Sequence, residues 1–398
     1  MRRDVLQPVS AGLIASIVGF SSTFALVLSG LRAVGATEAQ AASGLTALCL
    51  GMAVVGIWLA LRYRQPIAIA WSTPGAALLI SSGPPSGGYA AALGAFAVTG
   101  GLIVLAGLWR TLERWVAAIP VALASAMLAG VLLPVCLEPV RGVVDAPLDI
   151  GPVVLVWALL MRFARPWAVP GALLAAAVVI ALDPAEGSDG SLAPELTLTA
   201  PALNVGALVG LALPLFLVTM ASQNIPGMGV LASFGYRPPL RPALVSTGAA
   251  TAIGAPFGVH AINLAAITAA LMAGPDAHPD PARRWIASAA SGVVYLGLGL
   301  LAGAAATLAT LAPPHLIEAV AGLALVGALA GALTTAMEDA DRREAAIITF
   351  VVSASSITAL SISSPFWGLV AGLAFLGLQR LRPARPAPQD APRDEARV

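Results

Sequence analysis

The sequence predicts an all-α polytopic membrane protein in which two membrane-spanning segments are broken near their middle. Of its 398 residues, 58% are hydrophobic and only 10% are charged, whereas soluble domains carry about 25% charged residues. The mean hydropathy is +0.89, so lipid must cover apolar surface that a soluble core could not absorb. The two interrupted segments occupy corresponding places in the two halves of the chain, a pattern typical of transporter binding sites.

Fourteen apolar stretches come near the length of roughly 20 residues that crosses a bilayer. They cover residues 8–34, 39–61, 66–82, 88–108, 116–136, 149–163, 168–183, 202–233, 241–254, 256–273, 284–311, 315–337, 343–359 and 365–381. With this count, every basic residue except Arg32 and Arg141 falls on the side that holds both termini. The positive-inside rule then places both termini in the cytoplasm.

The chain divides at a polar connection without arginine, residues 184–201. Seven spans on each side of it, an odd number, require the two halves to be inverted relative to each other. We therefore expect a first repeat over 1–183, a periplasmic linker over 184–201 and a second repeat over 202–381. The proline- and charge-rich residues 382–398 are predicted to form a disordered cytoplasmic tail.

Span 66–82 carries the first break, at residues 71–75. Thr73 precedes a proline and is therefore disfavoured in a helix, whereas Pro74 suits the first helical turn. We expect an extended stretch and then a half-helix from about Gly75 to Ser82. Trp71, beside the break, can stack on a ring substrate or belong to an interfacial aromatic belt.

Span 256–273 carries the second break, at residues 256–263. Asn263 is the expected N-cap of a half-helix over 264–272, and Phe257 can either pack in the core or contact substrate. Two helix N-termini that converge near the bilayer midplane form an anion site without a charged residue. The breaks therefore favour a carboxylate, bound by backbone N–H groups at 73–75 and 262–263.

Polar side chains inside spans are few, and each has a structural alternative to a functional role. The adjacent amides of Gln223 and Asn224 must face the protein interior, where they can bind substrate or bridge helices. Ser22 and Thr23 can bind substrate or a carbonyl of their own helix. His260 can carry a proton, because histidine titrates near neutral pH, or remain neutral and hydrogen-bond substrate or backbone.

Several separate strings resemble the bacterial benzoate/proton symporter (BenE-type) family. They are AWSTPGAALL at 70–79, ASQNIPG at 221–227, NLAAITAA at 263–270, AHPDPARR at 277–284 and PFWGLVAG at 365–372. The likeness runs from about residue 5 to 380 and implies an inner-membrane carrier for benzoate or a close aromatic carboxylate.

That family is similar in turn to the uracil and xanthine permeases and the sulfate-type anion transporters. The similarity implies a core domain (8–108 and 202–311) and a gate domain (116–183 and 315–381), with substrate between the first, third, eighth and tenth spans. The nucleobase carriers place glutamates in the eighth and tenth spans. Here those spans offer Gln223, Asn224 and His260 instead.

We therefore expect a secondary transporter, not an enzyme, that imports an aromatic carboxylate with a proton and needs no cofactor or metal. A passive anion channel and a nucleobase permease are the alternatives. The net charge of +1 does not favour nucleic acid as a partner; the expected partners are the substrate, the proton and the bilayer, and a homodimer is compatible with the pattern. The candidate substrate-binding residues are Ser22, Thr23, Trp71, Ser72, Thr73, Gly75, Gln223, Asn224, Phe257, His260, Ile262 and Asn263, with His260 as the candidate proton carrier.

Overall fold

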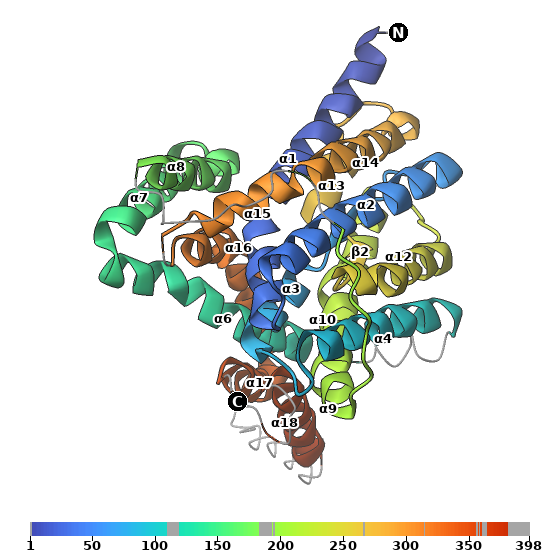
Figure 1. Ribbon diagram of the computed structural model, residues 1–398. Helices are drawn as coiled ribbons and strands as arrows, with labels where there is room; N and C mark the ends of the chain where they lie inside the picture. The colour runs from blue at the N-terminus through green and yellow to red at the C-terminus, as the bar shows by residue number, and fades with distance from the viewer. Residues whose placement is uncertain are drawn as a thin grey trace, which may run out of the picture.

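The computed structural model describes residues 2–109, 119–182, 193, 196–265, 267–313, 315–355, 357, 359 and 364–380. The described chain is mainly helical (Figure 1), with α1 (Arg2–Ala33), α2 (Glu38–Tyr63), α3 (Thr73–Ser82), α4 (Gly88–Leu108), α6 (Val121–Asp145), α7 (Pro147–Phe163), α8 (Ala168–Leu182), α9 (Val205–Ala207), α10 (Leu213–Thr219), α11 (Ile225–Ser233), α12 (Leu240–Gly254), α13 (Ile267–Ala273), α14 (Trp285–Leu300), α15 (Ala302–Thr310), α16 (Leu316–Glu338), α17 (Arg343–Ala354) and α18 (Ser364–Arg380). Two short strands, β1 (Ile69–Trp71) and β2 (Ile262–Leu264), complete it. The predicted tail, 382–398, and most of the linker before residue 196 lie outside these residues.

By length and composition, six described helices can cross a membrane: Val5–Ala33, Glu38–Tyr63, Gly88–Leu108, Val121–Asp145, Val205–Ser233 and Leu316–Glu338. A seventh candidate, over Pro281–Leu300 and Ala302–Thr310, is bent by 49°. The sequence predicted one span over 284–311; glycines at 297, 299 and 303 lower helix stability around the bend. Several other predicted spans correspond to shorter helices, such as α7, α8, α12, α17 and α18.

The two broken segments have the predicted form, an extended stretch followed by a short helix. β1 leads into α3 and β2 precedes α13, and the strands pair antiparallel with Trp71 opposite Ile262 and Ile69 opposite Leu264. α3 begins at Thr73, two residues before the predicted start, with Ser72 as its N-cap. The N-cap prediction for Asn263 is wrong, because Asn263 lies within β2 and α13 begins only at Ile267.

The eighth predicted span is one continuous helical segment, Val205–Ser233, with two π-helical turns that the sequence analysis did not predict. They cover Leu208–Ala212 and Met220–Asn224. Each turn is followed closely by a proline, Pro214 or Pro226, which has no N–H to donate. The wider turn shifts the hydrogen-bond register ahead of the proline, and such π-turns recur at functional sites.

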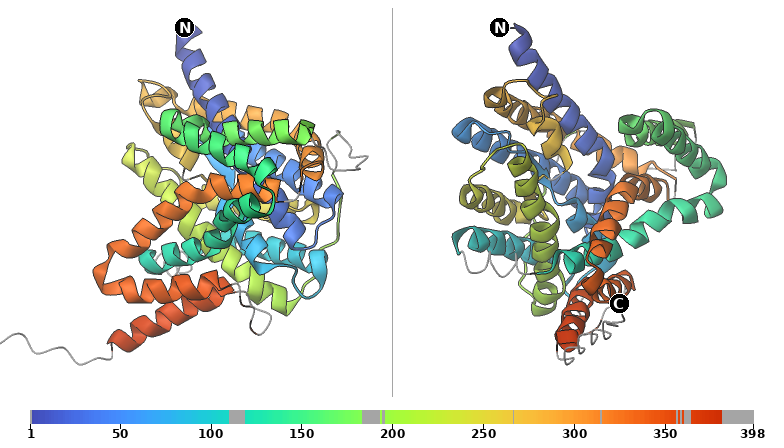
Figure 2. Two further views of the ribbon diagram at one scale, coloured as in Figure 1. Left: turned by 90° about the vertical axis from the view of Figure 1, so that its left-hand side faces the viewer. Right: turned by 180° about the vertical axis from the view of Figure 1, so that it is seen from behind.

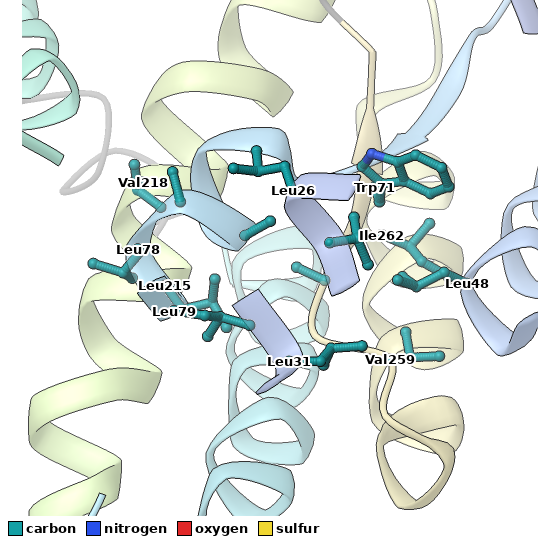
Figure 3. Close-up of a cluster of buried hydrophobic side chains, with 14 of the residues drawn as sticks. Leu26, Leu31, Leu48, Trp71, Leu78, Leu79, Leu215, Val218, Val259 and Ile262 are labelled. Carbon is teal, nitrogen blue, oxygen red and sulfur yellow. The ribbon is translucent and has the colours of Figure 1, made fainter. Parts of the chain in front are cut away.

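Helix α1 passes through the middle of the bundle, where it packs against α3, α13, α14 and α16. The pair α7 and α8 projects to one side of the bundle, and the N-terminal end of α1 extends beyond it (Figures 1 and 2). Around the breaks the core consists of buried apolar side chains from distant segments (Figure 3). They include Leu26, Leu31, Leu48, Leu78, Leu79, Leu215, Val218, Val259 and Ile262.

Candidate functional site

The paired strands β1 and β2 lie where the two broken segments cross, and they satisfy much of the backbone that the breaks leave without helical partners. Beyond the strand ends, the N–H of Ser72 donates to the Ala261 carbonyl at 3.0 Å, and the N–H of Ala265 donates to the Ala68 carbonyl at 2.9 Å. An unpaired backbone group would be costly inside a bilayer. Each break thus supplies hydrogen-bond partners for the other.

Ser72 connects three segments at the start of α3. Its hydroxyl accepts the Gly75 N–H at 3.0 Å and the Thr219 hydroxyl at 2.9 Å. Its carbonyl accepts the Ala76 N–H at 2.8 Å and His260 Nε2 at 3.0 Å. These bonds give Ser72 a structural role in this conformation.

The N-terminus of α3 therefore exposes fewer N–H groups than the sequence suggested. Gly75 and Ala76 already donate to Ser72, and Pro74 has no N–H. Among the described residues, none accepts the N–H of Thr73, which leaves it as the donor of this first turn that a ligand can use. The expectation of open N–H groups over 73–75 is corrected to Thr73 alone.

His260 is fully buried and joins the second break to the first. Since the Ser72 carbonyl can only accept, Nε2 must carry the proton that it donates. Nδ1 has no hydrogen-bond partner in the described part of the chain. The Phe96 ring packs edge-on against the imidazole, with 6.3 Å between the two ring centroids. Of the alternatives for His260, the structure therefore contains the neutral imidazole that hydrogen-bonds the backbone.

The outer edge of β2 is capped by side chains. The N–H of Ile262 donates to the Thr251 hydroxyl at 2.9 Å, and the N–H of Leu264 donates to Asn224 Oδ1 at 3.0 Å. Asn263 bridges the breaks when its amide is assigned from its neighbours: its oxygen accepts the Ser72 N–H and its nitrogen donates to the Leu264 carbonyl, both at 2.9 Å. The N–H of Ile262 is therefore occupied, contrary to our expectation of a donor open to substrate.

Gln223 and Asn224 both face the interior, as predicted, but in different surroundings. Asn224 is fully buried, and its amide also contacts Met220 Sδ at 3.3 Å. The Gln223 side chain is 8% exposed, and no described residue hydrogen-bonds its amide. Gln223 is therefore the amide that remains free for a ligand, whereas Asn224 holds β2 in place.

Trp71 is the centre of an aromatic cluster that faces α1 and α14. Its indole Nε1 donates to the Thr23 hydroxyl at 2.9 Å, and its ring centroid lies 5.9 Å from that of Phe20 and 6.2 Å from that of Tyr295. At 3% exposure, Trp71 is buried inside the bundle, which excludes the interfacial belt. Sequence reasoning missed Phe20 and Tyr295; only the position of Phe20 beside a polar cluster in α1 could have indicated it.

The hydroxyls of Ser22 and Thr23 bond to the carbonyl of Gly19 in their own helix, at 3.1 and 2.9 Å. Both side chains remain partly exposed in the middle of α1. The Thr23 hydroxyl also accepts the indole N–H of Trp71, so it both donates one hydrogen bond and accepts one. Ser22 is the less constrained of the two.

Phe257 lies apart from this cluster. It ends the 3-10 turn Ala255–Phe257, and its carbonyl accepts the Ser43 hydroxyl, near the N-terminal end of α2, at 3.0 Å. No ring contact joins Phe257 to Trp71 within the described ranges. In this conformation Phe257 therefore lies apart from the rings around Trp71, and its contact with substrate stays a prediction.

The loop after α13 is held by a buried arginine. Arg284 is 6% exposed and donates to the carbonyls of Ala273 and His278, each at 2.7 Å. A cation at this end of α13 also complements its dipole. Nearby, burial raises the pKa of the Tyr236 phenol, against the opposing effect of the Arg284 guanidinium.

Comparison with known proteins settles the family. The model of the benzoate membrane transport protein family matches residues 5–378. The chain belongs to this family. It is 40% identical over 364 residues to the inner membrane protein YdcO of Escherichia coli, covering 91% of this chain and 93% of that protein. It is 31% identical over 372 residues to the benzoate membrane transport protein of Acinetobacter baylyi, covering 92% and 94%.

Solved structures with the same fold are anion transporters of low sequence identity. The transmembrane domain of the cyanobacterial bicarbonate transporter BicA matches with a TM-score of 0.59 at 13% identity, covering 92% of this chain and 97% of that one. Murine Slc26a9 in the inward-facing state matches with a TM-score of 0.61 at 13% identity, covering 96% and 69%. This member of the benzoate transport family is thus a membrane transporter and not an enzyme. No group of His, Cys, Asp and Glu in its described part could hold a metal ion.

Proposed function

We propose that this protein imports benzoate, or a close aromatic carboxylate, together with a proton across the bacterial inner membrane. The observation that carries the proposal is a buried aromatic wall beside uncharged polar groups at the crossing of two broken segments. The named activity of the Acinetobacter baylyi relative and the inner-membrane description of the Escherichia coli relative support the substrate and the location.

In this proposal the aromatic ring of the substrate packs beside Trp71, and its carboxylate meets neutral donors. The Thr73 N–H lies at the positive end of α3, which attracts an anion. The Gln223 amide and the partly exposed Ser22 hydroxyl are the other groups available to the carboxylate. Ser72, Gly75, Asn224, Ile262 and Asn263 fix the geometry of the breaks, and Thr23 fixes the Trp71 ring.

Proton coupling follows from the electrostatics of import. Benzoate is an anion at neutral pH, and the membrane potential opposes its entry by about 2.3 kcal/mol per 100 mV. A co-transported proton makes the step electroneutral. We assign the proton to His260, whose Nδ1 has a lone pair without a partner among the described residues; the substrate carboxylate is the competing carrier of that proton.

The proposal includes the architecture that the sequence predicts. Fourteen spans would form two inverted repeats, with both termini in the cytoplasm and a core domain that moves against a gate domain. The fold shared with BicA and Slc26a9 supports this arrangement. A homodimer is compatible with it.

The test uses the purified full chain in proteoliposomes. A binding panel of benzoate, uracil and sulfate should select benzoate, and a proton gradient should drive benzoate uptake above equilibrium. Selection of uracil would support a nucleobase permease instead. Benzoate flux that never exceeds equilibrium under an imposed gradient would support a passive channel and overturn the symport mechanism.

A further inference from the structure

Tyr295 reaches the site from α14, an element that carries none of the residues assigned to substrate above. Its side chain is 5% exposed, and its ring meets Trp71 nearly edge-on, with an interplanar angle of 67°. An aromatic substrate beside Trp71 would therefore also be beside Tyr295.

The packing of α1 against α14 fixes where the Tyr295 hydroxyl points. The helices are in close contact at Gly12, where an added methyl group would lie 2.2 Å from the Ala287 carbonyl oxygen. One turn further, the hydroxyls of Ser16 and Ser291 hydrogen-bond at 2.7 Å. The next turn brings Tyr295 against Gly19.

The hydroxyl lies against Gly19 of α1, with Thr268 of α13 beside it. A methyl group on Gly19 would lie 3.0 Å from the Tyr295 hydroxyl oxygen and 3.5 Å from Thr268 Cγ2. Gly19 and Thr268 are both partly exposed although they lie inside the bundle. A methyl group at position 19 would therefore crowd the hydroxyl, and the glycine keeps this side of it uncovered.

The Tyr295 hydroxyl has no hydrogen-bond partner among the residues that the structure describes. Unlike the unpaired hydroxyl of Tyr89, its oxygen is not among the fully enclosed unpaired atoms of the described residues, so a ligand can reach it. A polar group that loses its partners in water without gaining others is costly. Unsubstituted benzoate has no second polar group to offer it. A hydroxyl on the substrate ring does, as long as the carboxylate is held at α3 and Gln223.

We propose that Tyr295 is a specificity-determining residue that hydrogen-bonds a hydroxyl on the substrate ring, so that the carrier prefers a hydroxybenzoate to an apolar benzoate of the same size. This inference rests on the proposed function, because it requires an aromatic carboxylate beside Trp71. A site built to hydrogen-bond a hydroxyl discriminates strongly against the analogue that lacks it.

The test measures how well ring-substituted benzoates inhibit uptake of radiolabelled benzoate by the full chain in proteoliposomes. At each ring position, the hydroxybenzoate is compared with the methylbenzoate. We expect one hydroxybenzoate to inhibit at a concentration about tenfold lower than its methyl counterpart, as one hydrogen bond allows. In Tyr295→Phe, which keeps the ring contact with Trp71, this ratio should fall to about 1.

Tyr63→Phe is the matched control, since it removes a hydroxyl at the end of α2, and it should keep the wild-type ratio. Gly19→Ala places a methyl group 3.0 Å from the Tyr295 hydroxyl oxygen and should weaken inhibition by the preferred hydroxybenzoate. A wild-type ratio near 1 at every ring position, or a ratio unchanged in Tyr295→Phe, overturns the role of Tyr295. Failure of the wild type to bind any aromatic acid overturns the proposed function, and this inference with it.

Discussion

Gln223 and Asn224 are adjacent amides, one without and one with a hydrogen-bond partner in the protein, and they therefore provide a paired test of the site. Asn224 Oδ1 accepts the Leu264 N–H at 3.0 Å, whereas no described residue bonds the Gln223 amide. Leucine is close to asparagine in shape but has no acceptor. Asn224→Leu therefore removes the cap of β2, and Gln223→Leu removes a group with no partner in the protein.

The expected change in the free energy of unfolding depends on which polar groups each substitution leaves without a partner. Hydrogen bonds between membrane helices contribute about 0.6 kcal/mol on average, because the unfolded chain in the membrane finds other partners. The Leu264 N–H has no such partner in the folded strand, and an orphaned buried donor costs about 1–3 kcal/mol. We expect Asn224→Leu to lower the free energy of unfolding by that amount. Gln223→Leu should leave it unchanged or slightly raise it.

The two variants should separate in a pair of assays. Stability is measured by unfolding in mixed micelles, and transport by initial benzoate uptake into proteoliposomes at matched protein content. Gln223→Leu should lose about tenfold in uptake, equivalent to 1.4 kcal/mol, with wild-type stability. Wild-type stability of Asn224→Leu, or full uptake by Gln223→Leu, would refute the division of roles between the two amides.

Further predictions concern groups that hold the breaks. Asn263→Leu removes the bridge to the Ser72 N–H and should weaken benzoate binding at least about tenfold; calorimetric affinity equal to wild type would contradict this. His260→Ala should reduce the dependence of uptake on external pH, and an unchanged pH profile would remove His260 from proton coupling. Arg284→Lys replaces the planar guanidinium with a single ammonium and should lower the free energy of unfolding by about 1–3 kcal/mol. Thermal unfolding measures this, and unaltered stability would show that the carbonyl contacts of Arg284 contribute little.

The break-bearing segments could be predicted because their signals are local. A proline in the first turn suits a helix start, and the structure has β1 followed by α3 there; the expectation that Thr73 lies outside the helix is wrong, because α3 begins at Thr73. The same reasoning failed at Asn263. A residue type that caps helices well also pairs well across strands when a partner strand lies alongside, and the position of that partner is not a local property of the sequence.

The sequence could not predict which polar groups of the site have hydrogen-bond partners, because most of those partners lie on distant segments. The donor at Ile262 is used by the Thr251 hydroxyl, a pairing without a sequence signal. The donor at Gly75 is used by Ser72, a local N-cap bond that the sequence analysis missed. The π-turn that ends at Asn224 aims this residue at β2, whereas a regular helix would present a different face. Tyr295 shares α14 with Ser288 and Ser291 in a mainly apolar sequence, and nothing in that sequence marked it as a site residue.

The groups of the site left free after this internal pairing are neutral: the Thr73 N–H, the Gln223 amide, the Tyr295 hydroxyl and His260 Nδ1. Arg284, a buried cation, is committed to carbonyls at the far end of α13. A lone carboxylate would enter this site without a counter-charge, and burial of an unpaired charge is costly. A carboxylate that arrives with a proton carries no net charge and avoids that cost. The donor set of the described site therefore favours coupled movement of acid and proton over passive flow of the anion.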